Sequence, residues 1–274
     1  MDTLTIRIST GRIIMANYDR LSSMQPDYEI YTNNPDISLN ANLHQAVRSL
    51  AIAGKDYGYV EVLTDQPTVL VPLKEFDEDD IDEIYHFNYP DSQTHTKVYY
   101  DTLPYLNALL LFAVDKDVSS TVSDYYPVAK FHSIYTALIR QYVARYPYSS
   151  TQPRLYCYLC EQQLTLVVVE QAMLKFINTY TIHNPADCLY YIAGIAQRTG
   201  ISVAPKDENT DMNIGRVYVS GYGPEARTLA DELPKIGLRP FYMDDNEELS
   251  HHPIAKIEEF PYDFKVHLLR AYEQ

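Results

Sequence analysis

The chain has 274 residues, of which 46% are hydrophobic and 22% charged, a composition that fits a globular protein and excludes a disordered one. Its 37 acidic and 22 basic residues give a formal net charge of −15. A field of that sign repels phosphodiester backbones and anionic membranes, so we expect no nucleic-acid partner.

Cysteine content and apolar runs predict where the protein works. Three cysteines are an odd number, which favours a reducing compartment. The N-terminus has neither a basic start nor an apolar run suited to export, and the longest apolar runs, at 108–114 and 166–169, are too short to span a bilayer. We therefore expect a cytoplasmic protein without direct membrane insertion.

The first half begins with a predicted β-hairpin. Leu4, Ile6 and Ile8 alternate with polar residues, Thr10 and Gly11 supply the turn, and 12–17 returns as a second strand. The other elements predicted in this half are strands at 28–31, 57–63, 68–73 and 106–114, and helices at 39–54, 118–126 and 134–146.

Four consecutive carboxylates at 77–80 have two interpretations. A metal site is one, although four successive residues of a helix cannot all face one ion. The alternative is an acidic first turn that the helix dipole favours, with Ile81, Ile84 and Tyr85 turned inward.

The second half follows a linker-like stretch at 147–153 that is rich in proline and serine. Asn184, Pro185 and Asp187 form a helix start, with a cap residue, proline at the first helical position and an early carboxylate. The elements predicted here are strands at 155–160, 164–169, 175–181, 216–220 and 239–243, and helices at 184–200, 224–236 and 264–272.

The order of elements repeats. Each half has three strands, a helix, a strand and a helix, which matches a duplicated ribonuclease-H-like lobe, the plan of actin-like ATPases. We therefore predict an α/β fold with two ribonuclease-H-like lobes in an actin-like ATPase arrangement, the first at 1–148 and the second at 149–274.

A more specific resemblance lies in the second half. An Asn-Thr-aromatic strand (Asn178 to Tyr180) precedes an Asp-x-Leu-Tyr-Tyr helix that begins at Asp187. This block resembles the bacterial domain-of-unknown-function family 3822, and the hairpin at 4–9 and His132 are similar to that family as well. The resemblance implies an actin-like ATPase fold, similar to the cytoplasmic platform proteins of pilus and secretion systems, and implies no activity.

An active actin-like ATPase needs two tight hairpin turns that present backbone amides to phosphate, each with an aspartate for Mg²⁺. In the first hairpin Arg7 stands near the aspartate position and Ser9 near the glycine position. Arg7 can pair with a phosphate but cannot hold a metal ion. Thr10 and Gly11 keep a permissive turn, which leaves weak anion contact open.

The second hairpin turn contains Glu161 but neither glycine nor aspartate. Gly221 and Gly223 lead from a strand into a helix and resemble the adenosine-binding turn of actin-like proteins. The alternative is an ordinary sharp strand-to-helix turn with Pro224 at the first helical position. Glu225 adds negative charge where phosphate prefers positive charge.

Other chemically suggestive residues favour structural roles. Cys157 and Cys160 are three apart on a predicted strand and point to opposite faces, as packed thiols do. The His251-His252 pair lies in an acidic loop where adventitious metal binding is conceivable. His132 and His183 have no obvious acid or nucleophile partner in sequence.

Our leading hypothesis is a non-catalytic actin-like scaffold that binds another protein, or a second copy of itself, through one lobe or the cleft between lobes. It uses no cofactor, and nucleotide hydrolysis has been lost. The rival is an ATP-binding actin-like protein with an altered Mg²⁺ site. A third hypothesis is a small-molecule binder or enzyme.

Overall fold

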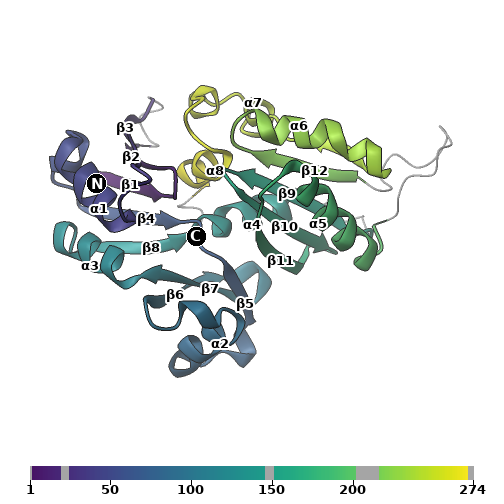
Figure 1. The fold of residues 1–274 in the computed structure, drawn as a ribbon, viewed down its shortest axis with the longest axis horizontal. Helices are drawn as coiled ribbons and strands as arrows, with labels where there is room; N and C mark the ends of the chain where they lie inside the picture. Colours follow the sequence, from purple (N-terminus) through teal and green to yellow (C-terminus); the bar gives the residue numbers. More distant parts are fainter. Residues whose placement is uncertain (1, 20–24, 146–150, 202–215, 271–274) are drawn as a thin grey trace. The chain divides into compact units, whose positions relative to one another are not determined.

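The computed structural model describes residues 2–19, 25–145, 151–201 and 216–270. The chain forms two compact units. The first runs up to Thr136 and takes in the chain again from His267, and the second is Ala137–Val266. Both are mixed α/β structures, as predicted (Figure 1).

The first unit is built on a five-stranded sheet with the order β3-β2-β1-β4-β8. Its strands are β1 (Thr3–Ile8), β2 (Arg12–Asn17), β3 (Asp27–Thr32), β4 (Tyr59–Thr64) and β8 (Ala129–Ser133). The β1, β2 and β3 strands are antiparallel neighbours, whereas β1, β4 and β8 are parallel.

One face of this sheet is apolar and is covered by α1 (Leu39–Ser49) and α3 (Lys116–Tyr125). Leu4, Ile6 and Val62 from the sheet share a buried cluster with Leu43 of α1 and Val118 of α3. The alternation in the first strand therefore decides which side of the sheet faces these helices.

A smaller antiparallel sheet with the order β5-β7-β6 is inserted after β4. It comprises β5 (Thr68–Pro72), β6 (Thr96–Leu103) and β7 (Ala108–Asp115), with α2 (Ile81–Asn88) packed against it. The acidic run at 77–80 lies just before α2, where Asp77 accepts a hydrogen bond from the Asp79 amide. This placement supports the interpretation of the run as a helix start.

The second unit repeats the plan of the first. Its strands are β9 (Arg154–Cys160), β10 (Gln163–Glu170), β11 (Met173–Thr181), β12 (Arg216–Gly221) and β13 (Arg239–Tyr242), in the order β11-β10-β9-β12-β13. Its hairpins are antiparallel and β9, β12 and β13 are parallel, as in the corresponding strands of the first sheet. The duplication predicted from the order of elements is confirmed.

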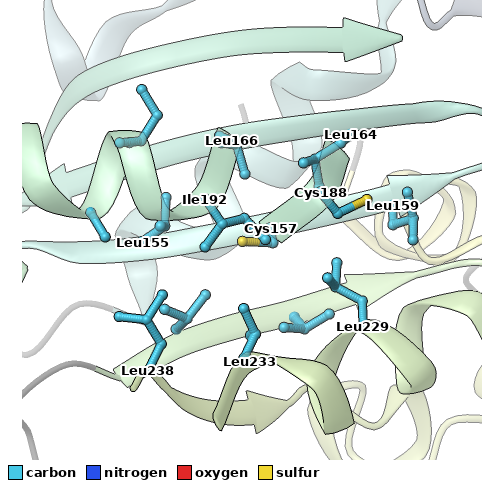
Figure 2. Close-up of a cluster of buried hydrophobic side chains, with 14 of the residues drawn as sticks. Leu155, Cys157, Leu159, Leu164, Leu166, Cys188, Ile192, Leu229, Leu233 and Leu238 are labelled. Carbon is cyan, nitrogen blue, oxygen red and sulfur yellow. The ribbon is translucent and has the colours of Figure 1, made fainter. Parts of the chain in front are cut away.

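Two helices cover one face of the second sheet, α5 (Pro185–Arg198) and α6 (Pro224–Glu232). Figure 2 shows the resulting core, in which Cys157 of β9 lies among leucines of both hairpin strands, Ile192 of α5 and Leu229 of α6. These side chains are all nearly or fully buried, so the helix positions relative to this sheet are set by apolar packing.

The start of α5 has the geometry that its sequence predicts. The Asn184 side chain accepts hydrogen bonds from the amides of Ala186 (2.9 Å) and Asp187 (3.2 Å), and the Asp187 carboxylate accepts from the Asn184 amide (3.1 Å). Hydrogen bonds from the amides of His183 and Asn184 lower the pKa of the Asp187 carboxyl below its ordinary value. This is a capping box.

Replacing Asn184 with alanine should lower the free energy of unfolding by about 1 kcal/mol, because two helix amides lose their acceptor. The expected fall in melting temperature is roughly 2–4 °C for a chain of this size. Asn184→Ser keeps a capping oxygen without placing a second carboxylate against Asp187, whose Oδ1 lies 2.9 Å from the Asn184 side-chain nitrogen, and should melt close to the parent. Calorimetry that finds equal melting temperatures for the parent and the alanine variant would show that the cap contributes nothing.

The remaining helices are α4 (Ile134–Ala144), α7 (Asp245–Glu248) and α8 (Tyr262–Arg270). The chain passes from one unit to the other within α4 and again within α8. Among the described residues, every helix is too short or too polar to cross a lipid bilayer.

Several sequence predictions need correction. Strands β6 and β8 were not predicted, and α7 was not either. The helix predicted at 264–272 begins earlier, at Tyr262. The predicted linker at 147–153, and with it the lobe boundary after residue 148, lies partly outside the described residues.

Candidate functional site

The first hairpin turn is held by hydrogen bonds to its carbonyl groups. The side-chain amide of Asn33 donates to the carbonyls of Ser9 (2.9 Å) and Thr10 (3.0 Å), and the Asn33 backbone amide donates to the carbonyl of Gly11 (3.0 Å). Ser9 donates from both its amide and its hydroxyl to the carbonyl of Arg12, each at 3.1 Å. None of Ser9, Thr10 and Gly11 has a positive φ angle.

Arg7 is fully buried in β1, with no exposed surface. The β1–β4–β8 register aligns Arg7 with Leu63 and His132, and Thr5 with Glu61. Side chains of aligned residues share a face of the sheet, and so do those of alternate residues along one strand such as Thr5 and Arg7. Arg7, Glu61 and His132 therefore lie on the same face, opposite the apolar core. The position that Arg7 occupies therefore belongs to a buried polar layer of the first unit.

Two carboxylate–histidine pairs form this polar layer. His267 Nε2 lies 2.8 Å from Glu61 Oε2, and His132 Nδ1 lies 2.7 Å from Asp101 Oδ1. The two imidazole rings are 6.5 Å apart. The second oxygen of Asp101 accepts from the Ser133 amide (2.9 Å) and from the Thr136 hydroxyl (2.6 Å).

The pairing changes the titration of His132. Burial alone would lower the pKa of His132, but the hydrogen bond to Asp101, the charge of Asp101 and the charge of Glu61 together raise it above its ordinary value. Sequence reasoning considered His132 but missed Asp101, Glu61 and His267. The available signal was a single carboxylate, Glu61, inside an otherwise apolar strand.

The second hairpin turn uses a strained backbone without glycine. Glu161 has a φ angle of 54°, in the left-handed region that favours glycine. The carbonyl of Gln162 accepts a hydrogen bond from the amide of Ile182 at 2.8 Å, which ties the turn to the end of β11. Only two residues connect β9 and β10, and the first of them carries a carboxylate where a phosphate-binding turn would have glycine.

Both glycines of the β12–α6 connection have a structural reason to be glycine. A Cβ at Gly221 would lie 2.0 Å from the carbonyl oxygen of Leu159 and 3.0 Å from the Cβ of Ala226. Gly223, the N-cap of α6, has φ 78° and ψ −176°, a conformation open almost only to glycine. Neither residue requires a nucleotide to explain it.

A pocket of about 260 Å³ lies within the second unit, at the turn between β9 and β10. The walls come from β9, the turn, the start of α5 and one side of α6. Its lining residues are Leu159, Glu161, Gln162, Ile182, His183, Asn184, Pro185, Cys188, Glu225, Thr228, Leu229 and Glu232. Glu161 and Glu225 were singled out from the sequence, whereas Glu232 and the lining role of His183 were missed.

The predicted site residues of this unit are thus close together. Glu161 lines the pocket, Gly221 is aligned with the lining residue Leu159, and Gly223 immediately precedes the helix that carries Glu225. Arg7, Ser9, Thr10 and Gly11 belong to the other unit, where they form the turn and polar layer described above.

The lining of this pocket does not fit a triphosphate with Mg²⁺. Its described residues include the carboxylates Glu161, Glu225 and Glu232 and no lysine or arginine, so a polyanion would meet like charge from them. Among the described residues no group of three or more histidine, cysteine, aspartate and glutamate side chains is arranged to hold a metal ion.

The cysteines and the histidine pair have structural surroundings. All three cysteines are free and buried, and burial raises the pKa of the Cys188 thiol to about 11. His252 Nδ1 accepts a hydrogen bond from the Ile254 amide at 3.2 Å, where it caps a short 3-10 helix. These contacts support the packed-thiol and structural interpretations.

Comparison with solved structures supports the fold. A Bacteroides thetaiotaomicron VPI-5482 protein with an actin-like ATPase fold and unknown function aligns with 91% of this chain and 94% of its own, at 20% identity and a TM-score of 0.79. The PilM-PilN type IV pilus biogenesis complex aligns over 100% of this chain and 99% of the matched chain, at 13% identity and a TM-score of 0.62. At these identities the likeness establishes the fold alone.

No curated protein matches the sequence. Residues 2–204 match the model of the family described as "Protein of unknown function (DUF3822)", which agrees with the resemblance found in the sequence. The predicted fold class is confirmed by the repeated sheets and by the two solved structures. The chain therefore belongs to the DUF3822 family of proteins of unknown function and has the actin-like ATPase fold.

Proposed function

We propose that this chain is a non-catalytic scaffold of actin-like fold that binds a protein partner, and that it has lost nucleotide hydrolysis. The observation that carries the proposal is the lining of the pocket beside the second hairpin turn. Three carboxylates, Glu161, Glu225 and Glu232, line it, and among its described lining residues none is lysine or arginine. Phosphate binding requires backbone amides or cations at such a place.

The first hairpin supports the same conclusion. Hydrolysis of a Mg²⁺-bound triphosphate requires hard oxygen ligands, and the strand before this turn has the buried cation Arg7 at the position expected for aspartate. The Ser9 amide of its turn already donates to the carbonyl of Arg12, at 3.1 Å, and is not offered to a phosphate. This turn is therefore built as an internal structural connection.

Two observations support a protein partner. One is the fold comparison, and the other is a described pocket lining that does not suit a nucleotide with Mg²⁺. PilM, whose complex with PilN has a similar fold, is a protein that assembles with another protein. A scaffold of this fold needs no metal or nucleotide chemistry of its own. The partner in our proposal is another protein, and the alternative partner is a second copy of this chain.

Two further parts of the proposal concern organisation and location. We assign residues 1–148 to a first ribonuclease-H-like lobe and residues 149–274 to a second. The protein works in the cytoplasm, a reducing compartment in which its three free cysteines would stay reduced.

ATP or ADP, each with Mg²⁺, should leave the melting temperature of the chain unchanged at millimolar concentration. A ligand at one hundred times its dissociation constant stabilises the folded state by about 2.7 kcal/mol, which would raise the melting temperature by several degrees. Differential scanning calorimetry measures the shift, and release of inorganic phosphate measures hydrolysis in the same samples.

Mg²⁺ alone and a non-hydrolysable ATP analogue are the matched controls. A rise of several degrees with nucleotide, and not with Mg²⁺ alone, would overturn the loss of nucleotide binding and support the rival ATP-binding protein. Phosphate release above the rate of heat-inactivated protein would contradict the non-catalytic assignment directly.

A further inference from the structure

We propose that two copies of this chain pair through the outer edge of β11, and that the Asn178 side chain covers this edge in the single copy. The inference goes beyond the proposed function, because it holds whether or not the chain also binds another protein. It concerns the second sheet alone. There the order β11-β10-β9-β12-β13 gives β11 a single neighbouring strand among the described residues.

The register with β10 shows which backbone groups of β11 point outward. The amide of Ile182 donates to the carbonyl of Gln162 at 2.8 Å, and in an antiparallel ladder such bonded positions alternate with unbonded ones. The residues that bond to β10 are therefore Phe176, Asn178 and Tyr180. Those whose amides and carbonyls point away from the sheet are Ile177, Thr179 and Thr181.

The Asn178 side chain lies on this outer edge. Its Oδ1 accepts a hydrogen bond from the Thr179 amide at 3.0 Å. Because that amide points outward, the Asn178 oxygen stands where the carbonyl of an added strand would have to accept. A further strand can pair along β11 only after the Asn178 side chain rotates away.

The composition of β11 suits an identical strand. Natural sheets protect their edges with charged residues, with proline or with short strands. The edge strand β3 carries Asp27 and Glu29, and β13 has 4 residues with Pro240 among them. Residues 173–182 contain no acidic residue and no proline, and their one charged side chain is Lys175. Two copies, each with a net charge of −15, can thus bring these strands together without facing carboxylates.

An antiparallel pair about a two-fold axis at Thr179 satisfies the outward groups of both strands. Thr179 then exchanges hydrogen bonds with the same residue of the second copy, and Ile177 exchanges them with Thr181, because paired positions lie equally far from the axis. All three residues already point their backbone groups outward, so the β10–β11 register stays as it is. Lys175 lies at the irregularity of that register, outside the pairing stretch.

Tyr190 supplies a side-chain surface beside this edge. It is 76% exposed, and its ring lies 5.5 Å from that of Tyr191, which stacks on Tyr180 of β11 at 4.1 Å. Tyr180 and Tyr191 both pack on the face of the sheet that α5 covers. A sheet that continues past β11 on this face would bring new side chains near the exposed ring and bury part of it.

Amide hydrogen exchange of the full chain, followed by NMR, tests the edge directly. In dilute protein the amides of Ile177 and Thr181 should exchange fast, whereas those of Phe176 and Asn178 are protected by β10. At submillimolar concentration the amides of Ile177 and Thr181 should become protected, and sedimentation velocity should detect a dimer. Fast exchange at both residues in a sample that contains dimer would place the contact elsewhere.

Removing the cap should strengthen the association. Asn178→Ala leaves the Thr179 amide available to a second copy and should tighten the dimer roughly fivefold. Asn88→Ala is the matched control, since Asn88 is an exposed asparagine of α2 whose side chain also bonds to a backbone group. It should leave the association unchanged.

Two further variants should weaken the dimer. Thr181→Pro removes an outward donor at a position where an edge strand tolerates proline, and it should weaken association at least roughly tenfold, whereas Thr181→Ala should not. Tyr190→Ser should weaken it roughly fivefold, whereas Phe87→Ser, which changes an 87% exposed ring of α2, should not. Melting temperatures show whether each variant is folded, and Tyr190→Ser keeps the test decisive if the proline variant does not fold.

The remaining outcomes overturn the inference. If the parent and Asn178→Ala both stay monomeric at submillimolar concentration, β11 is no pairing edge. A dimer that neither Thr181→Pro nor Tyr190→Ser weakens uses another surface. Salt should tighten the dimer by screening the repulsion between two acidic chains, so weakening by salt would indicate an ionic contact instead. These results are independent of the nucleotide response, so failure here leaves the proposed function standing.

Discussion

Replacing Gly221 with alanine should destabilise the second unit by roughly 3 kcal/mol or more. The added methyl carbon would lie 2.0 Å from the carbonyl oxygen of Leu159, 2.9 Å from its carbonyl carbon and 3.0 Å from Ala226. Two of these atoms are backbone, so no side-chain rotation relieves the contact. The β9–β12 pairing or the position of α6 would have to shift.

Urea unfolding followed by circular dichroism measures this effect, since the chain has no tryptophan. Gly194→Ala is the matched control. Gly194 lies within α5 with no atom within 4 Å of an added Cβ, so alanine there should stabilise the chain by about 0.5–1 kcal/mol. Equal stabilities for the parent and the Gly221 variant would show that the close approach is wrong.

The close backbone contact at Gly221 also limits which variants can test nucleotide binding. A bulky residue at Gly221 would remove ligand binding by disturbing the fold, whichever ligand the protein takes. Titration of the unmodified chain with nucleotide avoids this ambiguity. The glycine pattern that resembles an adenosine-binding turn has a sufficient structural cause in the strand pairing and in the N-cap of α6.

The second half was the more predictable from sequence. Its strands β9 and β10 are mostly apolar, α5 has a complete cap at Asn184, and α6 has Pro224 at its start. Each signal is local, so each element was found within a few residues of its observed bounds. The sequence analysis predicted the order of these elements along the chain, whereas their order in the sheet, β11-β10-β9-β12-β13, comes from the structure.

Two strands of the first half were missed because polar residues interrupt their buried apolar ones. Strand β8 has only five residues, and His132 turns toward the Asp101 and Glu61 layer instead of an apolar core. Strand β6 alternates around Asp101, which is buried because three donors surround it. Apolar periodicity alone does not reveal a short strand whose buried side chains are partly polar.

Only some of the polar residues that line the candidate pocket were identified from the sequence. Glu161 and Glu225 stand next to recognisable turns, so sequence reasoning reached them. Glu232, at the end of α6, and His183, just after β11, also line this pocket. That convergence depends on how two helices pack on the sheet, which a single sequence does not specify.

Asp101→Ala should cost the first unit about 3 kcal/mol or more of unfolding free energy. The buried carboxylate, 6% exposed, accepts from the His132 ring, the Ser133 amide and the Thr136 hydroxyl. Alanine leaves these donors without their acceptor in a buried place. Asp82→Ala, an exposed carboxylate in α2, is the control and should change stability little.

The pH dependence of Asp101→Asn separates charge from packing. In the parent the folded-state pKa of His132 is raised, so its protonation stabilises the fold fully below the unfolded pKa of about 6.5, and this stability is lost as pH rises through the raised value. Without the Asp101 charge the raised pKa should fall, and the loss of stability above pH of about 6.5 should become smaller. Urea unfolding at a series of pH values gives both slopes, and ring-proton NMR titration gives the pKa of His132. Parallel slopes and an unchanged titration would mean that Asp101 acts on His132 through geometry alone.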